Sequence, residues 1–235
     1  MINLRRMFEN HFDSKTLSDD KLRKFSMDHL ERLRSNNKDN KYDAMISETD
    51  TAYSNYFGAI KSEDINFSEQ QALTFSKDQA LRTFVGGVRQ KEGIVRGTWG
   101  KNSPEYQEFF PRGLVEFSRA TLANVETLMS RMVMAATKYK DTLGQPFLDY
   151  FTQLQTDFVQ VRGAQLQKLG SVSDSKQVTR ENRRALTEQL SKNLLTLAID
   201  FIGEPQRLND FFDQSILRRG GRTVSPTPGP FESEA

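Results

Sequence analysis

The sequence of 235 residues contains no cysteine and only two histidines, His11 and His29. The lack of cysteine excludes disulfides, thiolate metal sites and thiol nucleophiles, and it suits a reducing compartment. Neither histidine has a glutamate three residues before it, so the Glu-x-x-His pairs of di-iron helical bundles are missing. His29 falls on the apolar face of a predicted helix, where we expect a packing role and not a ligand role.

Long apolar runs are missing as well. No run of about eighteen apolar residues occurs, so we expect no transmembrane span. The N-terminus reaches charged residues within its first five positions and has no uninterrupted apolar run of the length found in a cleaved signal peptide. The net charge is only +2, from 33 basic and 31 acidic residues, so the chain as a whole is not an electrostatic nucleic-acid binder. We predict a cytoplasmic protein.

Catalytic motifs are absent too. There is no Gly-x-Ser-x-Gly elbow, no Walker loop and no His-Glu-x-x-His pair. Carboxylates are numerous, but no pair of them stands in apolar surroundings at a fixed spacing. The sequence therefore predicts a protein that is not an enzyme and that holds no cofactor or metal.

Apolar residues recur at helical spacing through most of the chain. They predict an all-α fold, an antiparallel helical bundle of four to five long helices with short capping helices. We expect loosely attached N-terminal amphipathic helices in 1–38 and the bundle in 39–218. A disordered tail is expected in 219–235, where proline, glycine and serine are frequent and no period is present.

Three features of the bundle are predicted from local signals. Gly58 and the polar stretch 62–67 are expected to form a turn, and 170–177 is expected to form a polar loop. The longest helix is expected over 113–143. The Gly-Gln-Pro sequence at 144–146 then predicts a tight reversal into an antiparallel partner helix.

Two stretches of the chain resemble each other, 100–114 and 203–216. Each has a glycine that ends a helix, then a proline, a short amphipathic helix and two adjacent phenylalanines, with an aliphatic residue five positions after the first phenylalanine. The match indicates a possible internal duplication with repeats 42–110 and 147–217, in a pseudo-twofold arrangement. We expect each phenylalanine pair to close one end of the bundle.

The segments FFPRGLVEFSRATLANVETL, NLLTLAIDFIGEP and FFDQSIL resemble uncharacterised all-helical proteins encoded by Bacteroidota. The likeness covers about 103–217. It implies an all-helical fold and supplies no activity, cofactor or site residue.

The most regular motif of the chain lies in 81–100, where three arginines are each followed by a glycine four residues later. A spacing of seven returns to nearly the same side of a helix, so these residues share one face. We name them the Arg/Gly face, and it consists of Arg82, Gly86, Arg89, Gly93, Arg96 and Gly100. Each glycine within the helix disfavours it by about 1 kcal/mol relative to alanine, so we expect close packing against another helix to compensate. A β-hairpin turning at 91–93 is the structural alternative.

The Arg/Gly face is the predicted site of function. We expect a non-enzymatic scaffold or adaptor that acts through protein-protein contacts or self-association at this face. As an alternative, Arg82, Arg89 and Arg96 could bind an anion or nucleic acid. A purely structural interpretation also exists, in which the arginines form ordinary surface ion pairs while the glycines permit tight packing. A carrier with a pocket between aromatic helices is a further candidate.

Overall fold

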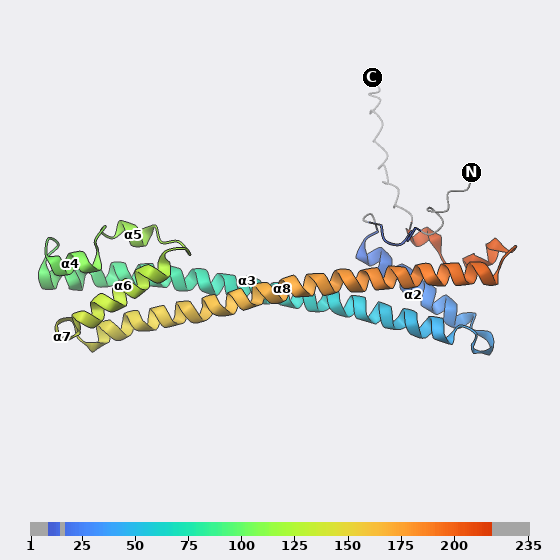
Figure 1. Cartoon of the computed structure of the whole chain (residues 1–235), viewed down its shortest axis with the longest axis horizontal. Coiled ribbons are helices and arrows are strands. Elements are labelled where there is room, and N and C mark those ends of the chain that lie inside the picture. Colours follow the sequence, from blue (N-terminus) through green and yellow to red (C-terminus); the bar gives the residue numbers. More distant parts are fainter. Residues whose placement is uncertain (1–8, 15–16, 218–235) are drawn as a thin grey trace, which may run out of the picture. The chain divides into compact units, whose positions relative to one another are not determined.

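The computed structural model describes residues 9–14 and 17–217, and every regular element within these residues is a helix (Figure 1). The predicted all-α class is confirmed. The predicted tail and the first eight residues of the N-terminal segment lie outside the described residues. The elements are α2 (Asp19–Ser35), the 3-10 helix η1 (Lys38–Asn40), α3 (Asp43–Trp99), α4 (Pro104–Phe109), α5 (Val115–Ser118), α6 (Val125–Lys138), α7 (Lys140–Leu143), α8 (Gln145–Asp200), and the 3-10 helices η2 (Pro205–Asp210) and η3 (Gln214–Leu217).

The chain divides into two compact units. The first consists of Met1–Ala59 together with Thr179–Ala235, and the second is Ile60–Val178. Helix α3 begins in the first unit and ends in the second, whereas α8 begins in the second and ends in the first. Helix α2 is an integral part of the first unit, because Leu22, Phe25 and four further residues of this helix are buried.

Helix α3 is continuous through 58–67, so the predicted turn there is wrong. The polar residues of this stretch are compatible with a helix because they face solvent or bond to α8. Asn66, for example, donates from Nδ2 to Ser175 Oγ at 2.6 Å. A single glycine such as Gly58 costs about 1 kcal/mol, which a helix anchored on both sides tolerates.

Helix α8 likewise continues through 170–177, so the predicted polar loop is wrong. The serines satisfy their hydroxyls within the helix: Ser171 Oγ donates to Gln167 O at 3.3 Å, and Ser175 Oγ donates to Ser171 O at 2.8 Å. Val172 is 7% exposed and fixes the orientation of this turn. Serine clusters therefore do not end a helix whose next apolar residue is buried.

The prediction of one long helix over 113–143 is also wrong. Here the structure has three separate helices, α5, α6 and α7, where one was expected. Gly113 has a φ of +67°, a conformation that favours glycine. Asn124 Oδ1 accepts from Thr121 N at 2.8 Å, an interaction that starts a new helix. The break allows Phe117 to turn inward, where its ring centre lies 6.0 Å from that of Phe84 and 5.8 Å from that of Phe110.

Aromatic rings form the interior of the second unit. Phe109, the last residue of α4, and Phe110, directly after it, are 0% and 2% exposed. Phe109 packs against Trp99 at the end of α3, with a ring distance of 6.3 Å, and against Phe147 at the start of α8, at 6.1 Å. The phenylalanine pair therefore joins the end of one long helix to the beginning of the other.

The first unit contains the same kind of interior. Phe211 and Phe212, just after η2, are 2% and 4% exposed. Phe211 packs against Phe201 beyond the end of α8, at 5.6 Å, and against Tyr42 before the start of α3, at 5.4 Å. In both units the glycine before the short helix has positive φ, +83° at Gly100 and +90° at Gly203.

A buried polar network lies beside Phe212 in the first unit. The imidazole of His29 stacks on the Phe212 ring at 4.1 Å and is fully buried. Its Nδ1 lies 2.9 Å from Phe211 O and its Nε2 lies 3.0 Å from Asn193 Nδ2. These partners require a neutral ring that donates from Nδ1 and accepts at Nε2. The expected packing role of His29 is confirmed.

Burial lowers the pKa of His29 to about 4, although the Phe211 carbonyl and the Asp28 carboxylate act in the opposite direction. Above the ordinary histidine pKa of 6.5, His29 does not change the free energy of unfolding with pH. Between 6.5 and about 4 the unfolded chain binds a proton that the folded chain rejects, so the free energy of unfolding falls by roughly 3 kcal/mol.

We predict that His29→Gln removes this pH-dependent component. Urea unfolding at several pH values between 7.5 and 4 measures it as the difference between wild type and variant, which should shrink as the pH falls. His11→Gln is the matched control, because His11 is exposed and lies outside the buried network of His29. A difference between wild type and His29→Gln that is constant with pH would contradict the buried neutral imidazole.

Candidate interaction face

The Arg/Gly face lies on the part of α3 that belongs to the second unit. Five of its residues are in the helix, and Gly100 follows directly after the last helical residue, Trp99. All six residues are exposed. The helical interpretation is thus confirmed over the β-hairpin, and the structure exposes the three arginine side chains and the three glycine positions to solvent on one side of the helix.

Small and polar residues extend this exposed surface on both sides of the glycine row. Sequence reasoning missed them, although they recur at the same interval of seven and could have been found by extending the repeat. The additional exposed residues are Ala72, Ser76, Gln79, Thr83, Gln90 and Gly97. Together with the Arg/Gly face they leave one side of α3 without a large aliphatic side chain except Ile94, which is 45% exposed.

No helix of the described chain packs closely on the glycine strip, so the expected close packing does not occur within this part of the chain. A Cβ atom added at Gly86, Gly93 or Gly97 would meet no atom within 4 Å. The close approach occurs instead at Gly87, where an added Cβ would lie 2.6 Å from the hydroxyl oxygen of Tyr150. The helix is anchored from its other side, where Phe84, Val88 and Val95 are fully buried.

The three arginines have weak partners within the chain. Arg82 lies over the ring of Phe75 at 5.9 Å, and Arg89 donates from Nη2 to Ser118 Oγ at 2.9 Å. Arg96 Nε lies 3.9 Å from Glu92 Oε1 on its own helix. Within 9–14 and 17–217, neither Arg82 nor Arg89 forms an ion pair. Ordinary pairing with a neighbouring helix therefore does not account for this row.

Glu92 is directed away from the face. It is 8% exposed and accepts from the Tyr106 hydroxyl at 2.8 Å. Burial, and then the hydrogen bond to Glu92, raise the pKa of Tyr106 to about 12, so the phenol remains a donor at all physiological pH values. The only carboxylate between Arg82 and Arg96 is thus held inside, and the exposed side stays positive.

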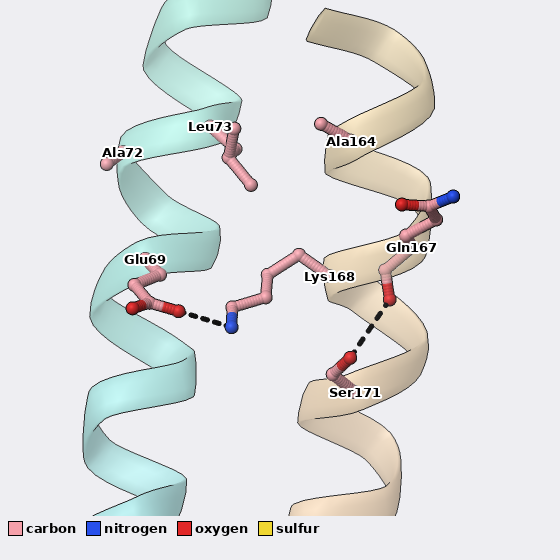
Figure 2. A pocket seen from close by; sticks show the side chains of 7 residues that line it. All are labelled: Glu69, Ala72, Leu73, Ala164, Gln167, Lys168 and Ser171. Atoms are coloured by element: carbon pink, nitrogen blue, oxygen red, sulfur yellow. Dashed lines mark hydrogen bonds and ion pairs between the residues drawn. The ribbon is translucent and has the colours of Figure 1, made fainter.

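A shallow groove between α3 and α8 adjoins this side of α3 at Ala72 (Figure 2). Its volume is about 490 Å³, and Leu73 and Ala164 supply apolar lining. Lys168 forms an ion pair with Glu69 across the groove, as Figure 2 shows, and also donates to Asn66 Oδ1 at 2.8 Å. Because the lysine is fully engaged, the groove offers shape but no free reactive group.

In the described part of the chain, no group of three histidine, aspartate or glutamate side chains is arranged to hold a metal, and no helix is long and apolar enough to cross a bilayer. Comparison with protein-family models, with curated proteins and with solved structures finds no match to this chain. The likeness to Bacteroidota proteins stays a prediction.

We predict different effects of adding a methyl group at the two adjacent glycines. Gly86→Ala should raise the free energy of unfolding by about 0.5–1 kcal/mol, because alanine favours helix and the space is open. Gly87→Ala should lose this gain because Tyr150 must move and its contact with Lys91, 5.1 Å from the ring centre, is disturbed. Thermal unfolding of both variants checks this. Equal stabilisation by both would contradict the close approach at Gly87.

Proposed function

We propose that the protein is a non-enzymatic scaffold or adaptor that binds a partner helix along the Arg/Gly face, with a second copy of the chain as its first partner. The observation that carries the proposal is the open glycine strip. Gly86, Gly93 and Gly97 each disfavour α3 by about 1 kcal/mol, and within the described chain no atom lies within 4 Å of a Cβ built at any of them. Backbone exposed in this way allows the axis of a second helix to approach closely.

Exposed apolar groups beside the strip support a protein partner. Phe75 is 63% exposed and Ile94 is 45% exposed, on the same side of α3 as the glycines. A docked helix would bury the Phe75 ring and the Ile94 side chain and would leave the arginines at its edge. Apolar anchors surrounded by a polar rim are typical of protein interfaces.

Charge along α3 favours a second copy as the partner. Residues 43–69 contain six acidic side chains and one basic side chain, whereas 70–99 contain five basic and two acidic ones. Two copies of α3 in opposite directions would bring unlike charges together, and two parallel copies would not. The proposed scaffold is therefore an antiparallel self-association, in the cytoplasm as the sequence predicts.

The internal duplication belongs to the same proposal. Helices α3 and α8 have 57 and 56 residues, and each is followed by a positive-φ glycine, a proline and a buried phenylalanine pair. The two copies of the pattern are offset by about 100 positions along the chain, since Phe109 and Phe211 are 102 positions apart. We infer that repeats 42–110 and 147–217 share one pattern and that the predicted antiparallel bundle arises from pairing them.

We predict that Gly93→Leu weakens self-association at least tenfold, because a branched side chain would hold the partner helix away. Size-exclusion chromatography with light scattering, at about 0.1 M and about 1 M salt, measures this, and high salt should also weaken association. Gly170→Leu is the matched control, since Gly170 is an exposed glycine inside α8 with no atom within 4 Å of its Cβ position.

Circular dichroism must show that both variants remain helical. A wild type that stays monomeric at every concentration would contradict self-association. The scaffold function itself would be contradicted if, in addition, wild type and Gly93→Leu captured the same proteins.

Anion or nucleic-acid binding through Arg82, Arg89 and Arg96 is a second candidate, because the first two have no carboxylate partner among the described residues. It predicts binding to single-stranded DNA that weakens steeply with salt. Arg89→Glu should reduce the affinity by more than tenfold in fluorescence anisotropy, whereas unchanged affinity would eliminate this candidate.

A further inference from the structure

A second positively charged site lies in the second unit, apart from the Arg/Gly face. It is a pocket of about 710 Å³ formed by the loop before α5, α5 itself and the first turns of α6. Three arginines line it, Arg112, Arg119 and Arg131, together with Glu116. The volume falls within the range of small-molecule sites.

The charges of the pocket are unbalanced. Glu116 forms an ion pair with Arg131, while Arg112 and Arg119 are exposed and form no ion pair with any described residue. The four groups therefore sum to +2. Since like charges repel, two unpaired guanidinium groups lining one pocket favour an anion between them.

Arg131 is held in position at the pocket wall. Its guanidinium bonds to Glu116 through Nη2 and lies over the Phe117 ring at 5.6 Å. Its Nε is buried and has no hydrogen-bond partner among the described residues. A fixed arginine loses little freedom when it binds a ligand, so its remaining donors are preorganised.

Two neutral donors complete the lining, Asn124 and Thr127. The orientation of the Asn124 amide is set, because its Oδ1 already accepts from the backbone nitrogen of Thr121 at 2.8 Å and from the hydroxyl of Thr121 at 3.3 Å. The Nδ2 group of Asn124 is left as a donor. The pocket thus presents guanidinium, amide and hydroxyl donors and only one carboxylate.

We propose that this pocket binds a phosphate group, either as the free ion or as a small phosphate monoester. A carboxylate has two oxygens in one plane and is satisfied by a single bidentate arginine. Phosphate presents oxygens on several sides and carries close to two negative charges at neutral pH, which matches the donors and the charge of the pocket. Binding here is independent of the proposed helix docking, because the two sites share no residue.

Isothermal titration calorimetry of the full chain with inorganic phosphate, phenyl phosphate and acetate tests the proposal at constant ionic strength. We expect saturable binding of at least one phosphate compound and none of acetate, and the tighter of the two identifies free ion or ester. Arg119→Gln and Arg112→Gln should each weaken binding about tenfold, the effect of losing one charged hydrogen-bonding group.

Arg180→Gln is the matched control, since Arg180 is an exposed arginine of α8 that does not line this pocket. It should leave phosphate binding unchanged. The absence of saturable heat with both phosphate compounds would overturn the proposal. So would equal weakening in Arg180→Gln, or acetate binding as tight as phosphate, because either would reduce the effect to general charge attraction. Arg112 and Arg119 are both exposed, so circular dichroism should show folded variants.

Discussion

The burial of adjacent phenylalanines determines the architecture of this protein. In each unit a long helix ends, a glycine in positive φ redirects the chain, and a six-residue helix then places Phe109 and Phe110, or Phe211 and Phe212, in the interior. Each pair packs against residues at or next to the end of one long helix and the start of the other. Aromatic side chains bury the largest apolar areas of any residues, so the ends of the helices, and not their middles, carry the main cores.

The middle of the α3–α8 contact in the second unit is polar by comparison. Lys77 and Gln165 are only 6% and 5% exposed there, and Asn66 bonds to both Ser175 and Lys168. Hydrogen bonds contribute less than apolar burial but penalise wrong alignments, since a shift would leave buried donors without partners. These contacts therefore set the register of two helices whose stability comes from elsewhere.

The sequence predicts three features from local signals: the fold class, the end of each long helix near Gly100 or Gly203, and the inward phenylalanines. It does not predict where the long helices continue and where 113–143 is interrupted. The serine-rich stretch 170–177 remains helical because Val172 is buried and the serines bond to their own helix. The stretch 113–143 breaks instead, and the break allows Phe117 to pack against Phe84 in the interior. Both outcomes depend on long-range contacts. For the same reason the seven-residue interval predicted which residues share the Arg/Gly face but not that Gly87, one position away, is the glycine in close contact.

The division of the chain has a consequence for its synthesis. The second unit is one contiguous stretch, Ile60–Val178, whereas the first combines Met1–Ala59 with Thr179–Ala235. On the ribosome, α2 emerges well before its partners Phe211 and Phe212, so His29 and Phe25 must wait for residues about 180 positions later. Contacts at such long separation close slowly. Helix α2 therefore leaves apolar surface uncovered until Phe211 and Phe212 have been synthesised, whereas the contiguous second unit can assemble before they emerge.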